Sequence, residues 1–149
     1  MVIYTGSLKF SPVFKSHCCA FGRVCEALGF SVYYMFSRCY SWMLDKDVKY
    51  KTVFVGSTKG IFSMLFDFLN PLNYIKLLHA FKRHPPSHVY LHNYHLLNHF
   101  IAKLCKLIDA LFIYHVHEPY VEKKRAHGKF AHIVLNMYCL LYTSPSPRD

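Results

Sequence analysis

Residues 1–36 read MVIYTGSLKF SPVFKSHCCA FGRVCEALGF SVYYMF, and this stretch determines the fold class. Met1–Thr5 is a short apolar run closed by Gly6-Ser7, which is typical of a buried strand that ends in a turn. Apolar residues then recur at helical spacing from about Lys15 to Leu28, and a glycine follows where a C-terminal cap belongs. Ser31–Phe36 is a second apolar run. We therefore expect a βαβ unit, whose strands are parallel and whose connection is right-handed.

The rest of the chain continues the alternation of strands and helices. Further strands are predicted at Lys51–Gly56, His88–His92 and Ala110–Val116, and helices at about 61–83, 96–107 and from 130 to 138. Asn70-Pro71 interrupts the first of these helical regions, so two helices or a kink are expected there. No internal repeat or linker divides the chain. The sequence therefore predicts an α/β fold with a Rossmann-like, doubly wound parallel sheet.

The last eleven residues, Cys139–Asp149, have an unusual character. They resemble one reading frame of a common sequencing adapter, and they are excluded from fold reasoning. The alternative is a genuine Ser/Pro tail. We expect a truncated domain at residues 1–138 and a non-native tail at residues 139–149.

The chain is basic, with a formal net charge of +10 and a pI of about 9.4. Nucleic acid, an anionic membrane surface or a phosphorylated substrate fits such a charge. The basic residues recur singly on helical segments, however, and a solvated helix face accounts for most of them. No helix-turn-helix, zinc or RNA-recognition signature occurs, so nucleic acid is not an expected partner. The stretch Lys76–Arg83 fits either peripheral membrane contact or an exposed helix face.

The cysteines and histidines indicate the cellular compartment of the chain and whether it binds a metal. The six cysteines form no Cys-x-x-Cys pair, which indicates a reducing compartment without a disulfide framework. No secretory signal and no apolar run long enough to span a bilayer is visible, so a cytoplasmic location is predicted. Eleven histidines occur, but the strand pattern between His88 and His92 breaks any shared helix face. Neither a metal nor a cofactor is expected.

Ligands of an open parallel sheet bind beyond the carboxyl ends of its strands. That rule selects Gly6-Ser7, Gly56–Lys59, His92–His95 and His117–Tyr120. The first loop leads into a helix but lacks Gly-x-Gly-x-x-Gly, so a dinucleotide site is not supported. Gly56–Lys59 does not match the spacing of a phosphate-binding loop and is interpreted as a turn.

The two histidine-containing segments carry more chemical information. Imidazole, amide and carboxylate groups together hold hydroxyls and exchange protons near neutral pH. Each histidine also fits a capping or packing role. His115 alternates with His117, so both can face one side of the sheet. Glu118 precedes a proline that holds it in an extended conformation.

These segments resemble the N-terminal domain of GT-B glycosyltransferases of the family 4 type. The matching features are Ile3–Leu8, the helix end at Cys25–Val32, Ser87–His95 and Ile113–Pro119. Each piece is degenerate, and their order and spacing over residues 1–138 carry the resemblance. The first loop departs from the family, because it has Ser11–Phe14 where many members have a Gly-Gly pair.

The resemblance implies two Rossmann-like domains that face a cleft. The N-terminal domain holds a glycan or lipid-linked acceptor, and a C-terminal domain, absent here, holds a nucleotide-sugar donor. Transfer retains the anomeric configuration, without a metal, and the fragment alone is expected to be inactive. His117 matches a histidine beside the reacting sugar and is the predicted catalytic residue. The predicted substrate-binding residues are Gly6, Ser7, His92, Asn93, Tyr94 and Glu118. The alternative is a non-catalytic α/β sugar- or nucleotide-binding module.

Overall fold

The computed structural model describes residues 1–8, 14–38, 50–56, 61–92 and 95–115. All of them belong to one compact unit, Met1–Val116. The helix predicted from residue 130 and the tail predicted at residues 139–149 lie outside the described residues. Within the described ranges, no helix has the length and apolar character needed to cross a bilayer.

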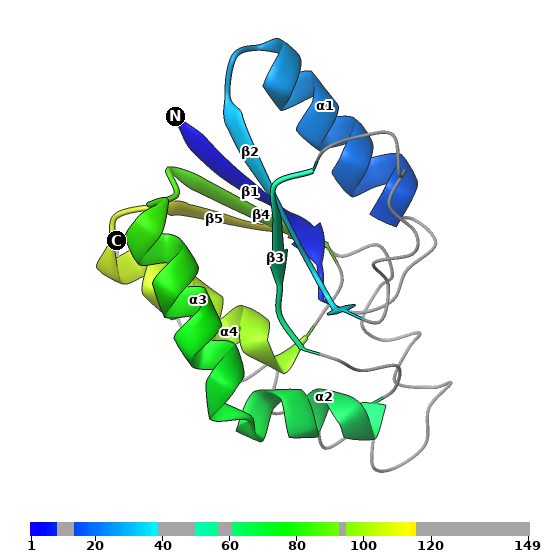
Figure 1. The fold of residues 1–149 in the computed structure, drawn as a ribbon, viewed down its shortest axis with the longest axis vertical. Coiled ribbons are helices and arrows are strands. Elements are labelled where there is room, and N and C mark those ends of the chain that lie inside the picture. The colour runs from blue at the N-terminus through cyan, green and yellow to red at the C-terminus, as the bar shows by residue number, and fades with distance from the viewer. Residues whose placement is uncertain (9–13, 39–49, 57–60, 93–94, 116–149) are drawn as a thin grey trace, which may run out of the picture. The chain divides into compact units, whose positions relative to one another are not determined.

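The described residues form ten elements (Figure 1). The strands are β1 Val2–Ser7, β2 Ser31–Phe36, β3 Thr52–Phe54, β4 His88–His92 and β5 Leu111–His115. The helices are the π-helix η1 Phe14–Cys19, then α1 Ala20–Ala27, α2 Ile61–Leu69, α3 Pro71–Arg83 and α4 Leu96–Leu107.

The five strands form one sheet in the order β3-β2-β1-β4-β5, and every neighbouring pair is parallel. The chain runs outward from β1 through β2 to β3, and it then returns to the other side of β1 for β4 and β5. The predicted Rossmann-like parallel sheet is thus confirmed. The reversal of strand order places a topological switch point between β1 and β4.

Helices cover both faces of the sheet (Figure 1). On one face, Ile3, Val32 and Tyr34 pack with the buried cysteines of η1 and α1. On the other face, Tyr4, Met35, Val89 and Leu91 pack with residues of α3 and α4, namely Leu77, Phe81, Leu97, Ile101 and Leu104. Successive strand side chains point to opposite faces, so two apolar clusters arise from the same strands. The sheet is therefore doubly wound.

Local signals in the sequence account for several helix boundaries. The side chain of Asn70 accepts a hydrogen bond of 3.0 Å from the backbone N–H of Leu72, and Pro71 occupies the first turn of α3. This is the favoured arrangement of an N-terminal cap followed by proline, and it produces the predicted break between two helices. Gly29 follows α1 with a φ of 83°, the left-handed conformation expected at a helix end.

The end of β1 differs from the sequence prediction. Gly6 and Ser7 were expected to form a turn, but both belong to the strand and pair with Met35 and Phe36 of β2. A Cβ on Gly6 would overlap the Met35 carbonyl group, with its carbon at 2.7 Å. Glycine is therefore needed here because two backbones approach closely, rather than because the chain turns.

Tyr4 connects the central strand to α3. Its ring is fully buried and stacks on Tyr33, with ring centroids 5.1 Å apart. Its hydroxyl lies 3.1 Å from the Ala80 carbonyl oxygen and 3.0 Å from that of His84, at the end of α3. A single hydroxyl proton is shared between both acceptors. The Ala80 carbonyl also accepts the His84 N–H at 2.9 Å, so the Tyr4 hydroxyl adds to the bonds that close the end of α3.

Candidate functional site

The carboxyl ends of the strands bring the predicted segments to one rim of the sheet. Gly6 of β1 pairs with Met35 on one side and with Leu91 of β4 on the other. His92, the last residue of β4, pairs with His115, the last residue of β5. The rim therefore carries the end of β1 and two histidines on the β4 side of the switch point, which is where α/β sheets bind ligands.

Four side chains meet at this rim on the face covered by α1, and we call them the rim histidine cluster: His17, Tyr90, His92 and His115. The Tyr90 hydroxyl lies 2.8 Å from Nδ1 of His115, and the same nitrogen lies 3.0 Å from Nε2 of His92. The ring of His17, from η1, stands edge-on to the ring of His92 with centroids 5.3 Å apart. Elements distant in sequence thus supply one group of imidazoles.

The alternation of β4 explains why Tyr90 and His92 share a face. Val89 and Leu91 point into the core on the α4 side, so the residues between and after them point to the other side. His92 is only 1% exposed, whereas His115 is partly exposed and His17 is exposed. The imidazoles of the cluster therefore range from the buried His92 to the solvent-exposed His17.

Proton sharing limits the states of the cluster. Nδ1 of His115 carries either one proton or one lone pair, so it cannot donate to His92 and accept from Tyr90 at the same time. A single proton shift therefore changes both contacts. Burial, with a smaller contribution from Cys18, raises the pKa of Tyr90, so its hydroxyl stays protonated near neutral pH. Such a group of hydrogen-bond donors and acceptors suits hydroxyl-bearing ligands.

A second polar group lies at the rim on the opposite face, and we call it the rim carboxylate cluster: Gly56, Asp67, Asn73 and His95. Nδ1 of His95 accepts the backbone N–H of Leu97 at 3.2 Å, which leaves the proton on Nε2, 3.7 Å from Oδ2 of Asp67. Asn73 accepts the Gly56 N–H at 3.0 Å and donates to the Asp67 carbonyl at 2.8 Å.

The rim carboxylate cluster has a structural role that its contacts explain. Asp67, Asn73 and His95 are all buried, and together they join β3, α2, α3 and α4. His95 is the N-terminal cap of α4, one of the two roles that its position in the sequence allows. Gly56 has a φ of 81°, and a Cβ there would lie 2.8 Å from the Asp67 carboxyl carbon. The glycine thus fits a turn packed on a carboxylate.

The predicted site residues have different outcomes. His92 lies in the rim histidine cluster, and Gly6 and Ser7 lie at the rim, where Ser7 is buried. The close approach to Met35 is a sufficient reason for Gly6 without any ligand. The predicted catalytic residue His117 lies outside the described residues, as do Asn93, Tyr94 and Glu118. Their roles stay predictions.

Sequence reasoning did not select the other members of the rim histidine cluster. Tyr90 stands two residues before His92, and this spacing places both on one face of a strand. His115 stands two residues before the predicted catalytic residue His117, but this position alone assigns it no role. No signal in the sequence indicated His17, because its place beside β4 depends on how η1 packs against that strand.

Nucleophilic catalysis by a cysteine and binding of a metal ion find little support at the described part of the rim. Burial raises the pKa of the Cys18 thiol to about 12, with smaller effects from Cys19 and from a hydrogen bond with Thr5. A neutral buried thiol is a poor nucleophile. Across the described residues, no three histidine, cysteine or acidic side chains are arranged to hold a metal ion.

No protein-family model matches the chain, and no curated protein matches its sequence. The chemistry of the rim therefore has to be inferred from the residues that form it.

Proposed function

We propose that the chain is the N-terminal, acceptor-side half of a retaining GT-B glycosyltransferase. In its full form the enzyme would move a sugar from a nucleotide-sugar donor to a glycan or a lipid-linked acceptor. The observation that supports this best is the meeting of His17, His92 and His115 at the rim beside the β1–β4 switch point. The same rim leads directly into the segment that contains the predicted catalytic histidine, His117.

A sugar acceptor suits the chemistry of this rim. Each sugar hydroxyl needs both a donor and an acceptor, and a neutral imidazole supplies one N–H and one lone pair. When the acceptor oxygen bonds to the anomeric carbon of the donor, the bond to the nucleoside diphosphate breaks and the hydroxyl loses its proton. An imidazole beside that hydroxyl can accept the proton near neutral pH. His117 is the proposed group, with the rim histidine cluster binding the acceptor next to it.

Other ligands fit the rim less well. The connection after β1 lacks the glycine-rich fingerprint that a dinucleotide requires, and the spacing of Gly56–Lys59 does not match a phosphate-binding loop.

The proposal is tested by recovering the genomic sequence downstream of the codons for residues 1–138. We expect it to encode a second Rossmann-like domain with a paired-glutamate motif. The encoded enzyme should transfer labelled sugar from a nucleotide-sugar panel to a glycan or lipid-linked acceptor. Replacing His117→Ala should lower the rate by about 100-fold or more, the usual contribution of a general base. Replacing the exposed His79→Ala on α3 is the matched control and should leave the rate unchanged.

Two results would overturn the proposal. The first is an unrelated domain downstream. The second is transfer that His117→Ala and His79→Ala leave equally intact. Binding of glycans without transfer by the extended protein would instead identify a non-catalytic binding module.

A further inference from the structure

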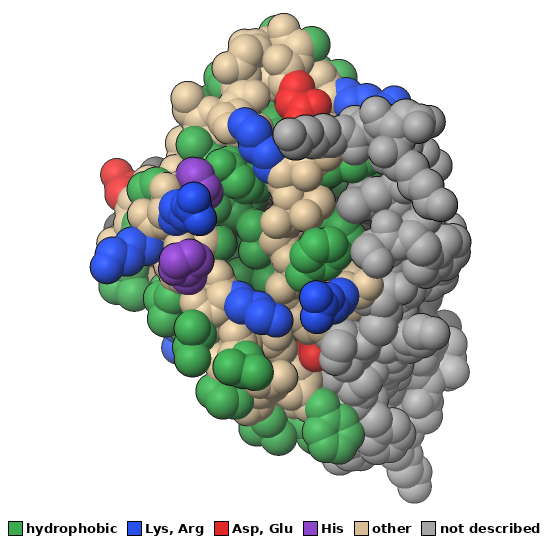
Figure 2. Space-filling view, viewed as in Figure 1, with side chains coloured by type: hydrophobic (Ala, Val, Ile, Leu, Met, Phe, Trp, Pro, Cys, Tyr) green, Lys and Arg blue, Asp and Glu red, His purple; other side chains and the backbone are tan. Residues whose placement is uncertain are grey.

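Helices α2 and α3 expose an apolar surface that the core does not use. It consists of Leu65, Phe66, Leu69, Leu72, Ile75 and Leu78, and we call it the α2–α3 apolar surface. Phe66 is 72% exposed and Leu69 is 66% exposed, although both are large apolar side chains. Figure 2 shows apolar side chains gathered over α2 and the adjoining part of α3. Contiguous apolar exposure of this kind marks an interaction site more often than scattered single residues do.

The surface is separate from the side of these helices that packs on the sheet. Met64 of α2 and Leu77 and Phe81 of α3 are buried and satisfy the packing requirement of each helix. An ordinary surface helix is polar on the side that faces water. On α3 that side carries Leu72, Ile75 and Leu78. Three large apolar side chains of α3, each at least 49% exposed, therefore lie outside the described core.

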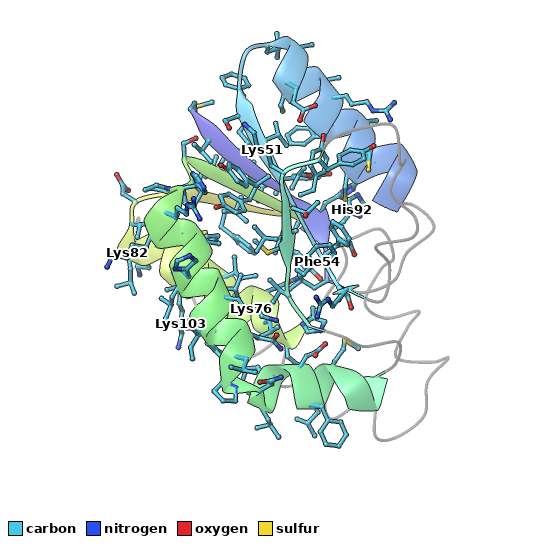
Figure 3. The ribbon with its side chains drawn as sticks, in the orientation of Figure 1. Lys51, Phe54, Lys76, Lys82, His92 and Lys103 are labelled. Carbon is cyan, nitrogen blue, oxygen red and sulfur yellow. The ribbon has the colours of Figure 1, made fainter. Side chains whose placement is uncertain are left out.

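Among the described residues of 61–108, the exposed charged side chains beside the apolar surface are basic. Helix α3 exposes Lys76 and Lys82, and the neighbouring helix α4 exposes Lys103 (Figure 3). Helix α3 also exposes His79 and Arg83. Residues 61–108 contain a single acidic residue, Asp67, and it is buried in the rim carboxylate cluster. The exposed charge of this region is thus positive. Apolar side chains bordered by lysines are the pattern of a helix that lies in a membrane interface.

We propose that the α2–α3 apolar surface docks on an anionic lipid bilayer. Phe66, Leu69 and Leu72 enter the boundary between headgroups and acyl chains, and Lys76 and Lys82 contact the phosphates. A second copy of the chain fits less well, because a symmetric pair that buried this surface would bring the lysines of both copies together. The inference uses only the surface of α2, α3 and α4, so it holds whichever ligand the rim binds.

The test is a vesicle flotation experiment with the 149-residue chain. The chain should float with phosphatidylcholine vesicles that contain about 30% phosphatidylglycerol, and it should stay at the bottom with pure phosphatidylcholine. Raising the salt from about 0.1 M to about 1 M should weaken the binding, because screening shortens the reach of the lysines. Lys76→Glu with Lys82→Glu should abolish flotation.

A matched pair of double variants distinguishes binding through the proposed surface from non-specific hydrophobic adsorption. Phe66→Ser with Leu69→Ser should lower the partition coefficient by about tenfold or more, because two large apolar side chains are removed from the interface. Val24→Ser with Leu28→Ser removes two residues that are 59% and 68% exposed at α1, on the other face of the sheet. That variant should bind as the parent does. Circular dichroism of each variant confirms that the fold is retained.

Three outcomes would overturn the proposal. One is equal loss of binding in the two double variants, and another is flotation that does not depend on anionic lipid. The third is a dimer in analytical ultracentrifugation that Phe66→Ser with Leu69→Ser dissociates, which would assign the surface to self-association.

Discussion

Replacing Gly6→Ala tests why a glycine stands in the central strand. A Cβ at this position would lie 2.7 Å from the Met35 carbonyl carbon, and the carbonyl oxygen is nearer still. Carbon atoms in contact are about 3.5 Å apart, so β1 and β2 would have to separate by about 1 Å. Both strands are buried at this point, and no flexible side chain can move aside.

The structure gives the size of the effect. An N–H···O bond of about 2.9 Å that is stretched by about 1 Å is lost. The register joins Gly6 to Met35 and Ser7 to Phe36, so the bonds at this end of the two strands are affected together. Each buried backbone bond lost costs about 1–3 kcal/mol, and two of them give a loss of about 2–6 kcal/mol in the free energy of unfolding. That is a large share of the stability of a typical domain.

The assay is equilibrium unfolding in urea, followed by circular dichroism. Gly29→Ala is the matched control, because a Cβ there meets nothing within 4 Å and only the φ of 83° opposes the change. It should cost about 1–2 kcal/mol, the expense of a left-handed conformation for alanine. A loss below about 1 kcal/mol for Gly6→Ala would refute the close-approach explanation. The glycine would then need a reason outside the packing of the strands, such as a bound ligand.

Three further predictions concern the rim and the core. Tyr90→Phe removes the hydroxyl that contacts His115, so we expect a loss of about 0.5–1.5 kcal/mol in the free energy of unfolding, measured in urea. An unchanged free energy would mean that this contact is not formed. His95→Ala removes the cap of α4 and should lower the free energy of unfolding by about 1–2 kcal/mol. His95→Asn should recover part of this loss, because asparagine also caps helices. Equal losses for both variants would contradict the capping role. Burial raises the pKa of Cys18 and of Cys105 to about 12 from the ordinary value of 9.0. The unfolded thiols therefore lose protons before the folded ones, so stability is fully present below about pH 9 and falls between about pH 9 and 12. Cys105→Ala should make this fall shallower in urea titrations at several pH values, and an identical fall would show that the thiol does not contribute.

The alternation of elements was predictable because its signals are local. The apolar run in β1, the helical spacing in α1 and the break at Asn70 each act within a few residues of sequence. Parallel pairing then follows from the helices between the strands. The length of β1 was not predictable, because the strand continues through Gly6 only where Met35 of another strand approaches it.

The rim histidine cluster was only partly predictable for a related reason. His92 follows an apolar strand, so its place at a carboxyl end could be read from the sequence. Its contact with His115 requires the register between β4 and β5, and its contact with His17 requires the packing of η1. Both depend on residues far apart in the chain. His95 was predictable only in part, because its cap on Leu97 is local but its contact with Asp67 appears only when α2 and α4 meet.

The most direct test of the rim as a sugar site is a histidine NMR titration of the 149-residue chain. The imidazole side chains are labelled with ¹⁵N and the resonances are followed while a panel of mono- and disaccharides is added. Binding at the rim predicts that the resonances of His17, His92 and His115 move together with one saturation curve. Those of the distant His79 should stay in place. Resonances that stay fixed with every sugar, or movement at His79 instead, would contradict a sugar-binding rim.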